Sequence, residues 1–127
     1  MVRRLRVFLV LPMAEALIYH MCRRAEWQAA QGAGAYAGSS QDGADGFIHF
    51  STAAQLEGSA AKHRAGQNDL VLIAVDPATL DGALKWEPAR GGALFPHLYG
   101  ALPIDKGRWV RALPLGSDGR HVFPPLA

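Results

Sequence analysis

A run of six apolar residues, Leu70–Val75, is held between Asp69 and Asp76 and constrains the fold more than any other feature of the sequence. The run is too short for a separate helix and is rich in β-branched residues, so it predicts a strand. Its side chains are apolar at every position rather than at alternate positions. This pattern is typical of a strand whose two faces are both buried.

Other apolar segments predict further strands, and two segments with helical spacing predict helices. Strands are expected over residues 17–22, 46–51, 84–87, 95–100 and 108–113, helices over 24–31 and 52–65, and a single helical turn over 77–80. Residues 32–46 are rich in Gly, Ser, Asp and Gln, which predicts a long loop, and loops of this length are often functional. The strands and helices do not alternate strictly, which favours an α+β fold over a doubly wound one.

The chain of 127 residues is expected to form one domain. We expect this domain to span residues 15–115, preceded by an extension over residues 1–14 and followed by a loose tail over residues 116–127. Arg3, Arg4 and Arg6 and the apolar residues after them weakly resemble a signal peptide. A start at Met13 is the preferred interpretation of this region.

Charge and cysteine content exclude several classes of partner. The net charge of +2 comes from the three N-terminal arginines, and the other basic residues are scattered among acids, which disfavours binding to duplex DNA. The single cysteine, Cys22, allows no intrachain disulfide, so a reducing, cytoplasmic location is expected. No apolar run approaches the ~20 residues of a membrane span, and we expect no membrane association.

Three histidines, His20, His49 and His97, lie within three of the apolar segments. An imidazole is costly to bury unless its nitrogens find partners, so each histidine needs a reason to be there. One reason is a core histidine bonded to backbone groups. The other is a shared cleft lined by imidazoles, to which Ser51, Thr52 and Tyr99 would add hydroxyl groups.

Glu87 stands between Trp86 and Pro88, where an indole could desolvate the carboxyl group and raise its pKa. The alternative is a solvated carboxylate at the end of a strand. Cys22 is expected to be a small buried side chain rather than a nucleophile. No local pair of histidines indicates a metal site, and the common glycine-rich nucleotide motifs are absent.

Several of these segments together resemble the domain of unknown function 952 family of small bacterial proteins. They are Ile18-Tyr19-His20, Trp27, Gly46-Phe47-Ile48-His49-Phe50-Ser51-Thr52, Asp69-Leu70-Val71-Leu72, Glu87 and Phe95-Pro96-His97-Leu98-Tyr99-Gly100. The resemblance implies a fold similar to that of the ADP-ribosyltransferases, in which a split mixed or antiparallel sheet with two to three short helices binds NAD in a cleft. Phe47-Ile48-His49 is similar to the His-Ile-His stretch of RNA 2′-phosphotransferases.

The resemblance also implies roles for the candidate residues. His20 would hold the NAD ribose, His49 and Ser51 would orient the nicotinamide half, and Glu87 would stabilise an oxocarbenium-like sugar. The catalytic set is then His20, His49 and Glu87, and the substrate-binding set is Ser51, Thr52, His97 and Tyr99. The expected function is an NAD- or ADP-ribose-linked transferase or glycohydrolase without a resident metal. Two alternatives stay open: a non-catalytic module for a small metabolite or a partner, with structural histidines, and a histidine-ligated metal enzyme.

Overall fold

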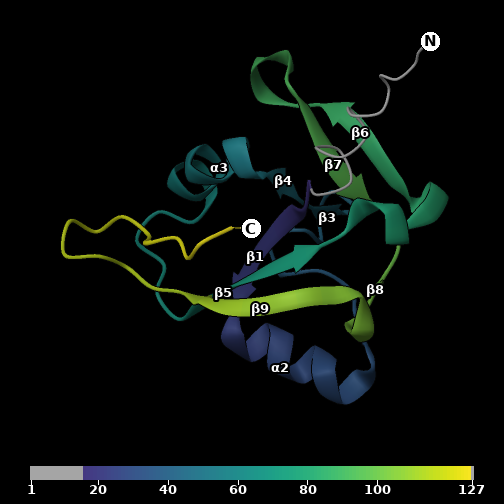
Figure 1. Cartoon of the computed structure of the whole chain (residues 1–127), viewed down its shortest axis with the longest axis horizontal. Coiled ribbons are helices and arrows are strands. Elements are labelled where there is room, and N and C mark those ends of the chain that lie inside the picture. The colour runs from purple at the N-terminus through teal and green to yellow at the C-terminus, as the bar shows by residue number, and fades with distance from the viewer. Residues whose placement is uncertain (1–15, 127) are drawn as a thin grey trace, which may run out of the picture.

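The computed structural model describes residues 16–126, which fold into an α+β domain as the sequence predicts (Figure 1). The expected extension over residues 1–14 and the alternative start at Met13 lie outside the described residues. The helices are α2 (Arg24–Ala33) and α3 (Leu56–His63). The strands are β1 (Ile18–Arg23), β2 (Ala35–Tyr36), β3 (Ile48–His49), β4 (Ser51–Thr52), β5 (Leu70–Val75), β6 (Leu84–Pro88), β7 (Leu94–Leu98), β8 (Leu102–Pro103) and β9 (Gly107–Leu113).

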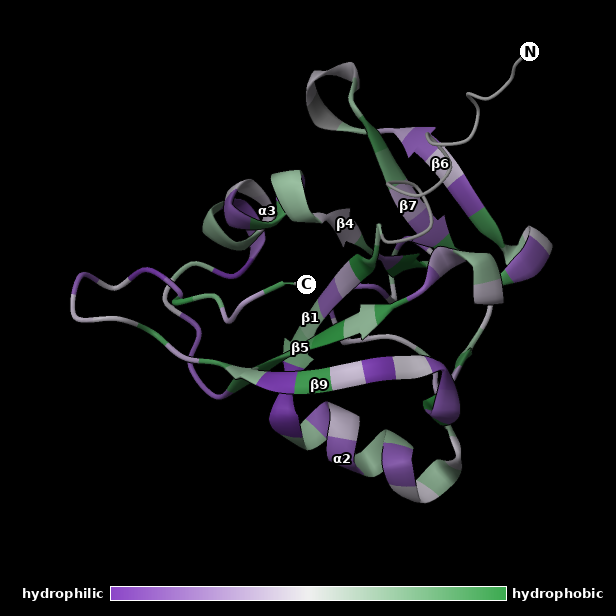
Figure 2. Cartoon of the chain, in the orientation of Figure 1, coloured by the Kyte–Doolittle hydropathy of each residue, from purple (hydrophilic) through white to green (hydrophobic). Residues whose placement is uncertain are grey.

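The strands form separate antiparallel sheets. The larger sheet has the order β4-β1-β5-β9, the smaller sheet has the order β3-β7-β6, and β2 pairs with β8. All six residues of β5 are buried, which confirms the prediction from the apolar run. β5 pairs on one side with β1 and on the other with β9, and it lies across the middle of the structure in Figures 1 and 2.

Alternation along β1 and β5 places two apolar clusters on opposite faces of the larger sheet. Ile18, Val71 and Ile73 face the cluster that includes Trp27 of α2 and residues of the smaller sheet. Tyr19 and Leu72 face the other cluster, whose members from α3 are Leu56 and Ala60. The apolar residues that Figure 2 colours green on β5 thus serve both cores.

The predicted strand over residues 46–51 is divided between the two larger sheets. β3 pairs with β7 of the smaller sheet, while β4 pairs with β1 of the larger one. Phe50 stands between them with only 1% of its surface exposed, and its backbone N–H donates to the carbonyl of Pro96. The chain therefore changes sheets at Phe50, which sets His49 and Ser51 on two different sheets.

Thr52 caps the helical segment that follows, as predicted, because its hydroxyl accepts a hydrogen bond from Gln55 N. The first turn is a 3-10 helix (Ala53–Gln55), and α3 starts only at Leu56. The start of α2 is tied by Glu26, which accepts from Arg23 N and, through its other oxygen, from Ser40 N. Glu26 thereby fastens the loop 37–47 to the helix.

The segment after Gly116, which we expected to be loose, packs back on the domain. Leu115 forms a β-bridge with His121, and Phe123 and Leu126 pack against the α3 side of the core. Leu126 also accepts a hydrogen bond from the hydroxyl of Tyr19 at 2.6 Å. The expectation was wrong because it was based on the polar turn at residues 116–120 and did not consider the apolar residues that follow this turn. Across residues 16–126, no helix has the length and apolarity needed to traverse a bilayer.

Candidate functional site

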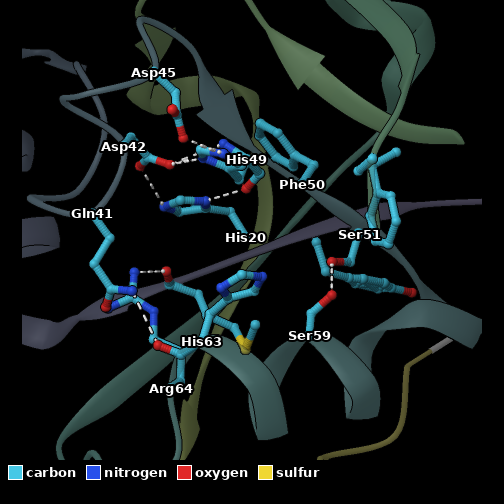
Figure 3. Close-up of a pocket in the computed structure, with 14 residues that line it drawn as sticks. His20, Gln41, Asp42, Asp45, His49, Phe50, Ser51, Ser59, His63 and Arg64 are labelled. Atoms are coloured by element: carbon cyan, nitrogen blue, oxygen red, sulfur yellow. Dashed lines mark hydrogen bonds and ion pairs between the residues drawn. The ribbon is translucent and has the colours of Figure 1, made fainter. Parts of the chain in front are cut away.

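A cleft of about 160 Å³ lies where β1, the loop 37–47, α3 and the turn between β6 and β7 meet. Figure 3 shows polar side chains from three of these elements converging on it. The labelled lining residues are His20, Gln41, Asp42, Asp45, His49, Phe50, Ser51, Ser59, His63 and Arg64. Imidazoles, carboxylates, hydroxyl groups and one guanidinium therefore surround a single space.

His20 projects from β1 into the core, and both of its ring nitrogens are bonded within the protein. Nδ1–H donates to the backbone carbonyl of His49, and the hydroxyl of Tyr36 donates to Nε2, each at 2.6 Å. These partners assign a neutral ring with the proton on Nδ1. The pKa of His20 is lowered because burial disfavours the charged imidazolium. This arrangement is that of a satisfied core histidine, and it leaves neither nitrogen open to a ligand.

Asp42, in the loop 37–47, is the acid around which the site is organised. Its carboxylate is 5% exposed and accepts four hydrogen bonds: from N and Oγ of Ser39, and from N and Nδ1 of His49. Burial tends to raise the pKa of this carboxyl group, but the bond from His49, the nearby His20 and the backbone donors together hold the pKa well below its usual range. Asp42 is therefore an ionised, buried carboxylate at neutral pH.

Asp42 is not among the candidate residues predicted from the sequence. The available signal was indirect: the loop is unusually long, and acids lie in it a few residues before the strand that carries His49. Nothing local indicates which acid turns inward. That choice depends on the packing of the loop against β1 and α2, which the spacing of residues does not encode.

His49 is held at both ring nitrogens by carboxylates. Nδ1 lies 2.6 Å from Asp42 Oδ1, and Nε2 lies 3.1 Å from Asp45 Oδ2. The side chain of His49 is 42% exposed and that of Asp45 is 53% exposed, so this second pair faces solvent. The hydrogen bond to Asp42 is the main cause of a raised pKa for His49, with smaller contributions from the charges of both acids.

An imidazole oriented through Nδ1 by a buried carboxylate is the arrangement found in acid–base catalysis, because it fixes the tautomer and leaves Nε2 to exchange protons. His49 has this orientation and lies at the mouth of the cleft. Its Nε2 would become available once Asp45, an exposed side chain, turned away.

His97 lies opposite His49 on the neighbouring strand, in register, with ring centroids 5.5 Å apart. The ring of Phe47 stacks on His97 at 4.0 Å and covers it, so that the His97 side chain is only 8% exposed. The three histidines therefore come together: His20 bonds to the backbone of His49, and His49 lies beside His97.

Glu87 is bonded to His97 and Tyr99 rather than desolvated by Trp86. Its Oε1 accepts from His97 Nδ1 at 2.8 Å and from the Tyr99 hydroxyl at 2.7 Å. These two bonds, that from His97 first, lower the pKa of Glu87, so the first of the two alternatives, a carboxyl group with a raised pKa, is wrong. The reason is that Trp86 points to the opposite face of the strand and is 45% exposed, whereas His97 and Tyr99 come from the facing strand segment.

Ser51 and Thr52 take different positions. Ser51 is buried in the cleft wall, where its Oγ lies 2.8 Å from Ser59 Oγ of α3. Thr52 uses its hydroxyl as the helix cap described above and does not line the cleft. Cys22 is fully buried, and burial raises the pKa of its thiol to about 11, as suits a small core side chain.

The side chains available as metal ligands and the volume of the cleft limit what the site can hold. Within residues 16–126, no three His, Cys, Asp or Glu side chains are grouped so as to hold a metal ion. Pockets for drug-sized ligands usually measure ~300–1,000 Å³. The cleft of about 160 Å³ is smaller than this and has room for only part of such a ligand.

Comparison with solved structures gives close relatives of the same fold. The crystal structure of protein CC0527 from Caulobacter crescentus is 47% identical, covers 84% of this chain and 93% of its own, and superposes with a TM-score of 0.80. The solution NMR structure of the same protein is 48% identical over 82% of this chain and 90% of its own, with a TM-score of 0.74. No curated protein matches the chain.

The family comparison agrees with the resemblance seen in the sequence motifs. Residues 21–110 match the model of the protein family of unknown function DUF952. This span includes the loop 37–47, both strands that carry His49 and His97, and the whole of α3. The chain belongs to the DUF952 family.

Proposed function

We propose that the cleft binds the nicotinamide-ribose end of an NAD- or ADP-ribose-type nucleotide and that His49 is its general acid–base group. The observation that carries the proposal is the short contact between His49 Nδ1 and the buried carboxylate of Asp42. This contact orients an exposed imidazole at the mouth of the cleft. The motif resemblance to the ADP-ribosyltransferases suggests the class of ligand.

The reaction would be transfer or hydrolysis at the glycosidic carbon of the ribose. The bond from C1′ to the nicotinamide nitrogen breaks, and its electron pair leaves with nicotinamide, which becomes neutral. The oxygen of water or of an acceptor hydroxyl then bonds to C1′, and its proton passes to Nε2 of His49. An oriented imidazole contributes typically ~10²–10⁴-fold to such a proton transfer.

Glu87 suits the positive charge that develops on the sugar. Its lowered pKa keeps it ionised at neutral pH, and a carboxylate stabilises an oxocarbenium-like transition state. Glu87 does not itself line the cleft; it pairs across the strands with Phe95, which does, so Glu87 lies beside the cleft on the same sheet face.

The geometry changes the role suggested for His20. Because its two nitrogens are bonded to His49 and Tyr36, we assign to it the support of the His49 backbone rather than contact with the ribose. His49 is then the histidine that reacts, and His20 is the histidine that holds the backbone of His49 in place.

The test is calorimetric titration of the whole chain with NAD, ADP-ribose and nicotinamide mononucleotide. We expect binding by the wild type that is weakened at least tenfold in His49→Gln and left unchanged in His121→Gln, a matched substitution outside the cleft. Nicotinamide release during incubation with NAD would support the enzymatic form of the proposal. Binding without release would favour the non-catalytic module instead, and no binding of any of these nucleotides at millimolar concentration would refute the nucleotide assignment.

A further inference from the structure

Arg64 is a buried cation in the wall of the cleft that the mechanism above does not use. Arg64 is only 4% exposed, yet it lines the cleft at the end of α3 (Figure 3). Its guanidinium donates to Gln67 Oε1, to the backbone carbonyl of Met21 and to Ser39 Oγ. All three acceptors are neutral.

A buried guanidinium normally lies against a carboxylate, since an unpaired buried charge is costly. No carboxylate of residues 16–126 lies within the 4.0 Å of an ion pair with Arg64. The nearest relation to an acid is indirect, because Ser39 Oγ accepts from Arg64 and donates to Asp42. Three hydrogen bonds also leave part of the five-donor fork unused. Arg64 therefore keeps donor groups that a ligand could engage, and the charges that act on it from within residues 16–126 include those of Asp42 and Glu26.

Asp45 provides a second, independent observation at the other end of the cleft. Its exposed carboxylate lies on Nε2 of His49, where it forms an ion pair at the cleft mouth. Asp42 already compensates the imidazole through Nδ1. The carboxylate of Asp45 therefore occupies the outward nitrogen of His49 in the free protein.

We propose that Arg64 binds the phosphate-type anionic group of the ligand in the cleft, and that the bound ligand displaces Asp45 from Nε2 of His49, which leaves this nitrogen to the reaction. The inference rests on the proposed function, which supplies a diphosphate-bearing ligand, and it adds the residues that recognise the anion. Asp45 then acts as an internal competitor that occupies the imidazole in the free protein. Gln41 and the hydroxyl pair of Ser51 and Ser59 supply neutral donors in the same cleft.

Arg64 and Asp45 have opposite effects on binding in this scheme. Asp45→Asn removes a carboxylate that competes with and repels the anion, so affinity should rise. An exposed ion pair contributes up to about 1 kcal/mol, which corresponds to a rise of about two- to fivefold. Arg64→Lys keeps the charge but loses the planar fork, so affinity should fall about tenfold or more.

The experiment titrates inorganic phosphate and pyrophosphate into the wild type, Asp45→Asn, Arg64→Lys and the control Asp105→Asn, while imidazole signals are followed by NMR. Asp105 is exposed and outside the cleft, and its substitution makes the same change of charge. We expect pyrophosphate to shift the His49 signals, tighter binding in Asp45→Asn, and wild-type affinity in the control. Thermal melting of each variant first establishes that it is folded; if Arg64→Lys does not fold, Asp45→Asn alone decides.

Two results would overturn the inference: no shift of His49 signals by pyrophosphate in either the wild type or Asp45→Asn, or equal affinities in these two proteins. The failure of the proposed function is distinguishable from this. Binding of pyrophosphate without binding of NAD or ADP-ribose keeps the anion site and removes the nucleotide assignment. If NAD binds with an affinity that neither Arg64→Lys nor Asp45→Asn changes, the nucleotide assignment is kept and the anion site is removed.

Discussion

Asp42→Asn is the substitution that most directly tests how the site is held together. The change preserves the shape of the side chain but removes its charge and converts one acceptor oxygen into an NH₂ donor. Asp42 accepts four hydrogen bonds, two on each oxygen, from Ser39 and His49. The amide can keep only the two on its remaining oxygen and would direct its own N–H groups at donors.

The magnitude follows from these contacts. A hydrogen bond to a charged group contributes about 1.5–3 kcal/mol, and removal of one partner from a buried ion pair costs about 3–5 kcal/mol. Two such bonds are lost at a side chain that is 5% exposed. We therefore expect the free energy of unfolding to fall by about 3–5 kcal/mol, a large part of the ~5–15 kcal/mol typical of a domain.

Urea denaturation followed by circular dichroism measures this loss, and we expect a midpoint lowered by more than about 1 M. The same variant should also lower the pKa of His49, since the hydrogen bond that His49 donates to Asp42 is the main cause of its elevation. An NMR titration of the imidazole protons gives that value. Asp45→Asn is the control, because this carboxylate is 53% exposed and its loss should cost less than about 1 kcal/mol. A loss below about 1 kcal/mol in Asp42→Asn together with an unchanged pKa of His49 would refute the reasoning.

Three further predictions concern neighbouring residues. The pKa of His49 is raised in the folded state, so its contribution to stability is fully present below its unfolded pKa of ~6.5 and is lost as the pH rises through the folded pKa. The difference in urea midpoint between the wild type and His49→Gln should therefore shrink over that pH range, and a constant difference would contradict this prediction. Tyr36→Phe removes the hydroxyl that donates to His20 Nε2 and leaves a buried acceptor unsatisfied, so it should cost about 1–3 kcal/mol by the same assay, whereas an unchanged midpoint would speak against the assigned tautomer. Gly38→Ala should destabilise the loop by about 1–3 kcal/mol, because φ of Gly38 is +108° and an added Cβ would meet Asp42 Cβ and Oδ2 at 3.2 Å. Amide exchange over residues 38–49 that matches the wild type would disprove this.

The parts of the fold predicted from sequence are those set by local patterns. The apolar run of β5 and the helix cap at Thr52 each depend on residues close together in the chain, and both were confirmed. The change of sheet at Phe50 was not predicted, because it depends on which distant strand each half of the segment meets. The apolar pattern of residues 46–51 is the same whether the segment forms one strand or two.

The site shows the same limit in its electrostatics. The sequence places Trp86 next to Glu87 and so suggests desolvation, but the strand directs these side chains to opposite faces. The groups that set the pKa of Glu87 are His97 and Tyr99, ten and twelve residues away, which the pairing of β6 with β7 brings alongside. Asp42 was missed for the equivalent reason, since a loop residue acquires its partners only from tertiary packing.

His20 connects the two interpretations that the sequence left open for the histidines. Its ring belongs to the core, but the carbonyl that accepts its Nδ1–H is that of His49, so a structural histidine fixes the backbone of the proposed catalytic one. Asp42 fixes the side chain of the same residue. Protonation of His20 would place an imidazolium among apolar rings and 3.7 Å from Asp42, and burial opposes it. A core imidazole kept neutral therefore holds His49 in place without exchanging protons with a ligand, which explains how three adjacent histidines can differ in function while sharing one cluster.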